Sequence, residues 1–199
     1  MEIREESLAH LEAHARIEIA FEVTRVFDLR VRDQGLGGFD LIERSVLPAY
    51  PKNYDAAPGS HPTEWGSRFD LTHWGLVSAW EGEQRLGGAV IAFDTKGLQM
   101  LEGRRDLAVL WDLRVAREAR RQGVGASLFA AACEWAAARR CSQLKVETQN
   151  VNVPACRFYA RQGCALHGIH RFAYPDLPEE VQLLWYKSLV DRPEVPTRK

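Results

Sequence analysis

The sequence predicts a single α/β domain, and three observations lead to that prediction. The chain has 199 residues, which suits one domain, and 46% of them are hydrophobic, which is enough to form a core. Runs with strand-like alternation are interspersed with runs in which apolar residues recur at helical spacing. No internal repeat or linker divides the chain. We therefore expect one domain over residues 1–191 and a disordered tail over residues 192–199.

The first part of the chain is expected to contain a short helix, a strand and an ordered loop. Residues 7–17 place their leucines on one side of a helix. Residues 21–31 alternate so that five of six positions on one face are apolar, and a glycine cluster ends this strand. Residues 39–72 show no regular pattern and contain four prolines, but their aromatic residues favour packing. Ordered loops of this length in compact domains are often functional.

The second part of the chain is expected to be rich in strands. Two strand-like runs, 74–80 and 85–93, are joined by a short turn and predict a hairpin. Residues 107–115 predict the next strand, and a glycine turn links it to a helix at 127–139. The helix predicted at 152–162 carries Pro154 in its first turn, where proline is tolerated. The last strand-like runs are 143–149, 165–172 and 181–189.

Composition and charge exclude several classes of function. The 26 basic and 27 acidic residues balance, so nothing points to nucleic acid or an anionic membrane. The N-terminus is charged and no long apolar run occurs, so we expect no signal peptide and no membrane span. The four cysteines lack zinc-type spacing and are expected to be reduced thiols of a cytoplasmic protein. His10 and His14 lie four apart without a further ligand nearby, so we expect no metal.

A glycine turn between the strand at 107–115 and the helix at 127–139 predicts a phosphate site. Gly123 and Gly125 have no β-carbon, so a ligand can approach their backbone closely. The free N–H groups and dipole of the following helix favour an anion there, and two arginines add positive charge. We expect a pyrophosphate to contact Arg120, Arg121, Gln122, Gly123, Val124, Gly125, Ala126 and Ser127.

Other interpretations of this turn fit less well. A Walker loop needs Gly-Lys-Ser/Thr, which is absent. A dinucleotide fingerprint needs a third glycine where Leu128 stands, and the strand at 143–149 ends without an obvious acidic ribose ligand. The remaining alternative is a glycine-rich turn that only begins a helix.

Two motifs together resemble the acetyl-CoA signature of the GCN5-related N-acetyltransferases (GNATs). The first is Arg-x-x-Gly-x-Gly at 120–125, and the second is Asn-x-x-Ala-x-x-Phe-Tyr-x-x-x-Gly at 152–163. The resemblance implies a mixed, mostly antiparallel central sheet flanked by helices, in which two parallel strands splay apart to bind acetyl-CoA. It adds Asn152, Ala155, Phe158 and Tyr159 to the expected cofactor contacts. Backbone N–H groups of Leu113, Arg114 and Val115 are expected to hold the thioester carbonyl, as oxyanion-hole donors do.

A closer resemblance covers almost the whole chain and points to streptothricin acetyltransferases, which acetylate the β-lysine part of an antibiotic. It is carried by the segments 26–28, 33–35, 44–46, 147–149, 152–156 and 184–186. Three features depart from that family's pattern. His170 stands where an aspartate is expected, Cys164 replaces a phenylalanine, and the loop at 56–72 is longer.

Three residues are candidates for the chemistry of amine acetylation. Tyr159 is the expected general acid, which requires that its phenol lie near the cofactor's sulfur. Glu147 is the expected base, because it occupies the slot of a base glutamate in related protein-N-terminal acetyltransferases; a structural carboxylate is the alternative. Asp112 is the rival base, and water relaying to either carboxylate is a further alternative.

The acceptor is expected to be a small cationic molecule with a primary amine. Carboxylates attract such an amine, although each one is as readily explained as a solvated surface group. A protein N-terminus or lysine is the alternative acceptor, and a catalytically silent acyl-CoA-binding module is the alternative from another class. A homodimer is compatible with the sequence, which does not fix the oligomeric state. The candidate acceptor contacts are Asp28, Asp33, Tyr50, His170 and Tyr174.

Overall fold

A computed structural model describes residues 1–190 of the chain as a seven-stranded sheet, a two-stranded ribbon and flanking helices. The expected tail at 192–199, with residue 191, lies outside the described residues. Within residues 1–190, no helix has the length and apolar character needed to cross a membrane.

The main sheet is mixed and mostly antiparallel, as the resemblance implied. Its strand order is β1-β4-β5-β6-β7-β9-β8, and the pairing of β6 with β7 is parallel while the others are antiparallel. Strand β1 was not predicted from the sequence. The strands are β1 (Glu2–Glu6), β4 (Gly75–Glu81), β5 (Gln84–Ala92), β6 (Leu107–Val115), β7 (Gln143–Gln149), β8 (Ala165–His170) and β9 (Gln182–Ser188).

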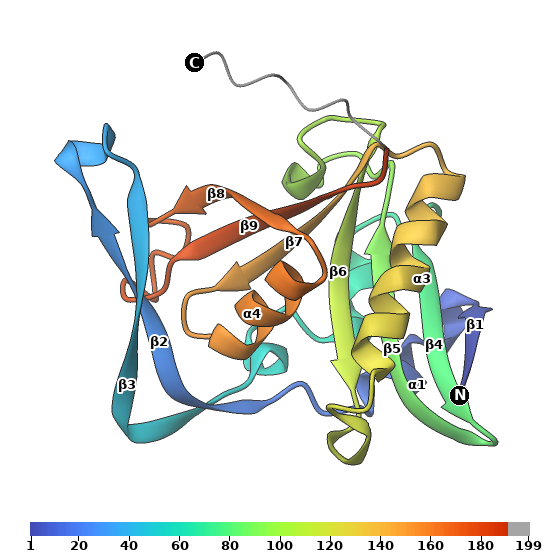
Figure 1. Cartoon of the computed structure of the whole chain (residues 1–199). Helices are drawn as coiled ribbons and strands as arrows, with labels where there is room; N and C mark the ends of the chain where they lie inside the picture. The colour runs from blue at the N-terminus through green and yellow to red at the C-terminus, as the bar shows by residue number, and fades with distance from the viewer. Residues whose placement is uncertain (191–199) are drawn as a thin grey trace.

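The parallel strands β6 and β7 splay apart towards their carboxyl ends. Their register runs only from Leu107 opposite Gln143 to Leu110 opposite Val146. Beyond those pairs, β6 continues to Val115 without a partner on that side, and the two strands diverge (Figure 1). A register shift against β5 falls at the same level, where Leu110 and Asp112 lie opposite consecutive residues of β5. The gap predicted between two parallel strands is therefore present.

Two helices cover the same face of this sheet. Helix α3 (Val124–Ala138) packs on β4, β5 and β6, and helix α4 (Val153–Arg161) packs on β7 (Figure 1). Helix α3 begins three residues earlier than predicted, directly after the glycine turn. The other helical turns are η1 (Leu8–His10), α1 (Leu11–Ala15), η2 (Asp33–Gly35), η3 (Tyr54–Ala56), η4 (Pro62–Glu64), α2 (Trp65–Arg68), η5 (Gln99–Leu101) and η6 (Arg117–Ala119).

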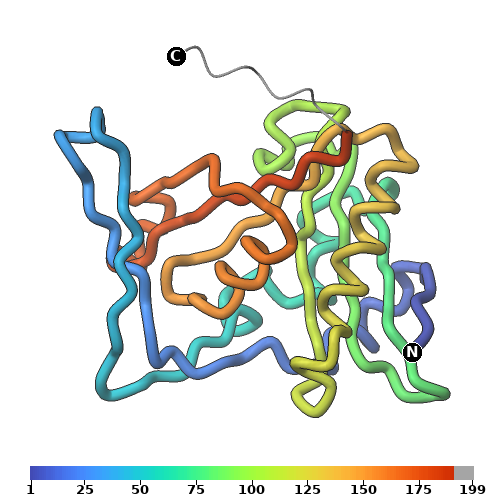
Figure 2. The backbone as a smooth tube through the Cα atoms, in the orientation of Figure 1, coloured from blue at the N-terminus to red at the C-terminus, as the bar shows by residue number. Residues whose placement is uncertain are grey.

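The expectation of an irregular stretch was wrong for its first part. Strand β3 (Phe39–Lys52) pairs with β2 (Phe21–Val31) in a ribbon that stands at the opposite end of the molecule from α3 (Figure 2). The prolines misled the prediction, because β3 has one free edge, where proline is tolerated. The register also jumps at Pro48: Val23 lies opposite Tyr50, but Arg25 lies opposite Ser45. Because of that shift, the side chain of Val26 points into the core, and that of Arg25 does not.

The rest of that stretch is ordered, as its aromatic residues suggested. Trp65 is only 3% exposed, and its ring contacts those of Trp74 and Trp111 in a second hydrophobic cluster. This cluster lies apart from the main core, in which α3 and α4 pack on the sheet. Residues 53–72 therefore form a packed wall beside the splayed end of β6.

Candidate active site

A cavity of about 900 Å³ occupies the gap between β6 and β7. Both sequence motifs reach it, together with the splayed ends of the two strands. The predicted residues that line it are Asp112, Leu113, Arg114, Val115, Arg120, Arg121, Gly123, Gly125, Ala126, Glu147, Asn152, Ala155, Phe158 and Tyr159. Gln122, Val124 and Ser127 are not among its lining residues. The volume lies in the range of small-molecule and cofactor sites.

The glycine turn has the backbone that a phosphate site needs. Gly123 precedes α3 with a φ of 86°, a left-handed conformation that glycine adopts without strain. A β-carbon at Gly123 would meet nothing within 4 Å, so this side of the turn is open. The first N–H groups of α3 have no partners within the helix and lie at the same place. The turn therefore offers donors and room to an anion.

The arginines of the turn have different surroundings. Arg120 donates to the carbonyl of Val115 at 3.0 Å and to that of Glu18 at 3.2 Å, so it ties the turn to the end of β6. Arg121 has a φ of 63°, is exposed and lines the cavity. Arg161 of α4 also lines the cavity and was missed by the sequence analysis, since neither motif specifies its position. Arg121 and Arg161 thus place positive charge at the cavity.

The motif asparagine begins the second helix. Asn152 is the N-cap of α4, and its Oδ1 accepts a hydrogen bond from the backbone of Ala155 at 3.1 Å. Such a cap stabilises a helix by about 1 kcal/mol. The amide of Asn152 also donates to the hydroxyl of Tyr54 at 3.4 Å, which joins the loop after β3 to α4. The motif therefore fixes where α4 begins and so where its side chains enter the cavity.

Tyr159 has the surroundings of a proton donor. It is 7% exposed, and its ring packs against those of Phe129 and Phe158. No group within residues 1–190 hydrogen-bonds its hydroxyl, and the residue lines the cavity. Burial, with the charge of Asp112 adding, raises the pKa of Tyr159 well above its usual range, so the phenol keeps its proton at any working pH.

Glu147 is held by neutral donors only. Its Oε1 accepts from the Tyr174 hydroxyl at 2.5 Å and from Gln149 at 3.1 Å, and its Oε2 accepts from Gln182 at 2.7 Å. No lysine, arginine or histidine within the described residues pairs with it. The cavity therefore keeps one negative charge at this point.

Tyr159 and Glu147 reach the cavity from opposite faces of the sheet. Thr148 contacts Cys156 of α4 at 3.3 Å, so it faces the helices, and its neighbour Glu147 faces the other way because side chains alternate along a strand. A donor molecule on the helix side and an acceptor on the far side can therefore meet in the gap. This geometry suits transfer of a group between two ligands.

Asp112, the rival base, belongs to a buried ion cluster. Its Oδ2 accepts from Arg114 at 2.7 Å and lies 3.5 Å from His14 Nε2. Burial alone would raise the pKa of Asp112, but hydrogen bonding and charge from His14 and Arg114 outweigh it and lower that pKa. Asp112 also lines the cavity. A carboxylate already neutralised by a guanidinium is a poorer proton acceptor than Glu147, although the choice between them stays a prediction.

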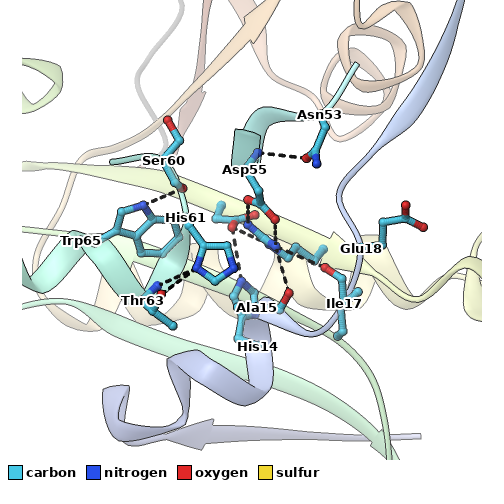
Figure 3. A network of polar contacts seen from close by, with 12 residues as sticks. His14, Ala15, Ile17, Glu18, Asn53, Asp55, Ser60, His61, Thr63 and Trp65 are labelled. Carbon is cyan, nitrogen blue, oxygen red and sulfur yellow. Dashed lines mark hydrogen bonds and ion pairs between the residues drawn. The ribbon is translucent and has the colours of Figure 1, made fainter. Parts of the chain in front are cut away.

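Arg114 joins three segments behind the cavity. Its guanidinium donates to both oxygens of Asp55, at 2.8 and 2.6 Å, and to the carbonyl of Ile17 at 3.2 Å. Figure 3 shows that Asp55, Ala15 and Ile17 lie around one point. The Arg114 guanidinium donates there to the Asp55 carboxylate and to the carbonyls of the other two residues. The cluster fixes the segment 53–55 against β6. Sequence analysis missed Asp55 and considered His14 only as a possible metal ligand, although His14 is buried beside Asp112. The partners of both residues lie far along the chain.

The comparisons with known proteins agree with this geometry. The model of the acetyltransferase (GNAT) family matches residues 39–164. The chain belongs to the GNAT acetyltransferase family. Members of this family transfer an acetyl group from acetyl-CoA, so the chain is an acetyltransferase and acetyl-CoA is its donor. The cavity between the splayed strands of this GNAT protein lies where both motifs predict the donor site, and the contacts with the donor stay a prediction.

Its relatives include streptothricin acetyltransferases. One from Escherichia coli is 34% identical over 169 residues, which cover 83% of this chain and 84% of the relative. The crystal structure of a nourseothricin acetyltransferase matches with a TM-score of 0.73 and 24% identity, over 95% of this chain and 98% of the other. A structure from Bacillus anthracis str. Ames in complex with acetyl coenzyme A matches with a TM-score of 0.72 and 25% identity, over 94% and 98%.

None of the five predicted acceptor contacts of this GNAT protein is among the residues that line the cavity. Asp28 pairs with Arg44 on the exposed ribbon, and Asp33 is exposed near the ribbon's tip. Tyr50 also lies on the ribbon. His170 is exposed at the end of β8, opposite Gln182. Tyr174 alone joins the site, through its bond to Glu147, so the structure does not bring the five residues together.

One wall of the cavity was not predicted. Ser60, Trp65 and Arg68 from the long loop line the cavity, together with Trp111 of β6. Trp65 is fixed by a hydrogen bond from its indole N–H to the carbonyl of Ser60 at 3.0 Å. The sequence indicated that this loop is ordered, but not that it lines the cavity.

A charge on the glycine turn should weaken acetyl-CoA binding. In Gly123→Asp, a carboxylate would face the cofactor's phosphates and the added β-carbon would strain a backbone with φ of 86°. We expect the Kd for acetyl-CoA, measured by calorimetry, to rise at least about tenfold, or ~1.4 kcal/mol. Gly123→Asn carries the same strain without the charge and should lose less. Equal affinity of wild type and Gly123→Asp would contradict the phosphate site.

Proposed function

We propose that this protein acetylates a primary amine of a small cationic molecule of the streptothricin kind, and thereby inactivates an antibiotic. One observation supports the cationic acceptor above all others: the carboxylate of Glu147 lines the cavity, and no cation among residues 1–190 is paired with it. An ammonium ion supplied by the substrate would complete that site. The similarity to streptothricin acetyltransferases over most of the chain supports the choice of antibiotic.

The proposed chemistry uses the two faces of the gap. Glu147, directly or through a water molecule, takes a proton from the acceptor's ammonium group, and the resulting amine attacks the thioester carbonyl. Backbone N–H groups at the end of β6, where this strand has diverged from β7, stabilise the developing oxyanion. The C–N bond forms, the C–S bond breaks, and Tyr159 gives its proton to the leaving thiolate. The proton that the nitrogen loses on forming the amide returns through solvent to the tyrosine.

The test is a turnover screen with acetyl-CoA over streptothricin, aminoglycosides, polyamines and N-terminal peptides. We expect streptothricin to be acetylated and its acetylated product to be inactive as an antibiotic. We also expect cells that express the protein to tolerate higher streptothricin concentrations. The proposed site of action is the cytoplasm, where acetyl-CoA is available. Turnover of peptides but not of streptothricin would favour a protein acetyltransferase instead.

His170 should make streptothricin binding weaker than an aspartate would. Residues directly opposite in an antiparallel pair share a face, so His170 lies on the same face as Gln182 and Glu147. A neutral imidazole there gives no attraction to a cation, and a protonated one repels it. We expect His170→Asp to lower KM by up to about fivefold, the factor for the ~1 kcal/mol of an exposed ion pair.

The neutral variant His170→Asn separates charge from size and should leave KM near the wild-type value. If neither the wild type nor His170→Asp turns over streptothricin, the assignment of the antibiotic fails, whereas acetylation of another amine would keep the general reaction.

A further inference from the structure

Glu147 differs from every other shielded carboxylate of residues 1–190. The others that are buried or half-buried each pair with a cation within 4 Å. They are Glu6 with Arg85, Asp40 with Arg32, Glu43 with Arg25 and Arg157, Asp55 and Asp112 with Arg114, Asp94 with Arg105, and Glu180 with Lys52. Removing a carboxylate from water without a cation is costly, so neutral donors have to stabilise Glu147.

Three side chains from separate segments supply these donors. Gln149 lies two residues after Glu147 on β7, and Gln182 lies directly opposite Gln149 on β9. Tyr174 belongs to the connection between β8 and β9. Gln149 also donates to the Tyr174 hydroxyl at 2.8 Å, so these two donors are joined to each other, while Gln182 is bonded to Glu147 alone. We call Tyr174, Gln149 and Gln182 the Glu147 clamp.

The clamp brings no positive charge to Glu147. Amide groups carry no charge, and the Tyr174 phenol stays protonated because burial, with the charge of Glu147 adding, raises the pKa of Tyr174. Its O–H therefore remains a donor to Glu147 Oε1. A carboxylate has about four acceptor sites and the clamp uses three of them, which leaves one for a ligand.

We propose that Tyr174 and Gln182, with Gln149, are positioning residues that hold the Glu147 carboxylate in place and aimed at the acceptor's amine. This inference rests on the proposed amine acetylation, but not on the identity of the amine. It also replaces the expected role of Tyr174, whose hydroxyl is bound to Glu147 rather than free for substrate. Tyr174 acts through Glu147 and has no separate role in binding the acceptor.

The test is a double-mutant cycle between Tyr174→Phe and Glu147→Gln, with whichever amine the wild type acetylates. Tyr174→Phe should lower kcat/KM about ten- to hundredfold, the size associated with a hydrogen bond to a charged group. Gln182→Leu should act in the same direction. Because Tyr174 acts through Glu147, Tyr174→Phe should have little further effect once Glu147 is replaced. Calorimetry should show an unchanged Kd for acetyl-CoA in each variant.

The matched control is Tyr186→Phe. Its hydroxyl also donates to a carboxylate, that of Glu102, but Glu102 is paired with Lys145 and neither tyrosine nor glutamate lines the cavity. We expect wild-type kinetics for this control. The proposal is overturned if Tyr174→Phe matches Tyr186→Phe, or if the effects of Tyr174→Phe and Glu147→Gln simply multiply. Turnover of another amine in place of streptothricin would overturn the antibiotic assignment alone, since the cycle uses the amine that reacts.

Discussion

Replacing Tyr159 with phenylalanine should lower kcat by ~10²–10⁴, the range for a positioned general acid, while the Kd for acetyl-CoA stays unchanged. The ring packs on Phe129 and Phe158, and phenylalanine preserves those contacts. The hydroxyl has no partner among residues 1–190, so its removal leaves no protein group unsatisfied. The loss should therefore appear in the chemical step and not in folding.

Steady-state kinetics at saturating acceptor and acetyl-CoA measure this effect, and single-turnover kinetics show whether chemistry limits the rate. An unchanged single-turnover rate in Tyr159→Phe would rule out this phenol as the proton donor. Tyr159→Phe could also have a higher melting temperature than the wild type. That result, together with a lowered kcat, would agree with the assignment, since active-site groups are often not optimised for stability.

Replacing Arg114 with methionine should destabilise the fold by ~3–5 kcal/mol, the cost of removing one partner from a buried ion cluster. The Arg114 side chain is 1% exposed and holds Asp112, Asp55 and the carbonyl of Ile17 together. Without it, two carboxylates would lose their cation, and the segment at 53–55 would lose its anchor on β6. Chemical denaturation should show a lower free energy of unfolding.

The control is Arg105→Met, which removes a guanidinium from an exposed pair with Asp94. The Arg105 side chain is 85% exposed, so its removal should cost no more than about 1 kcal/mol. The account of the cluster is wrong if the two variants unfold alike. Because the pKa of Asp112 is lowered in the folded state, its contribution to stability is present above about pH 4 and should be lost as the pH falls further.

The sequence predicted the elements around the donor site because local patterns determine them. The strands at 107–115 and 143–149 have the predicted bounds, and the glycine turn and Pro154 mark the starts of the two helices. Strand β3 was missed because two prolines hide its alternation and a register jump at Pro48 breaks it. Strand β1 is short and charged, and only its pairing with β4 makes it a strand.

The candidate site was predictable only where a motif names its residues. Tyr159 and Glu147 follow from motif positions, and the structure places both at the cavity. Gln182, Asp55 and His14 come from distant segments and acquire their partners only in the folded chain. The acidic residues of the ribbon illustrate the reverse case. Their charge made Asp28 and Asp33 candidates, but both lie exposed on the ribbon and outside the cavity.

The most direct test of the central claim is a crystal structure of the protein with CoA and its amine acceptor bound. The account predicts the CoA sulfur beside the Tyr159 hydroxyl and the acceptor's nitrogen beside Glu147, each within hydrogen-bond reach of about 2.6–3.2 Å or through one water. The two ligands should enter the gap between β6 and β7 from opposite faces of the sheet. A complex in which the amine lies against the ribbon, away from Glu147, would contradict the account.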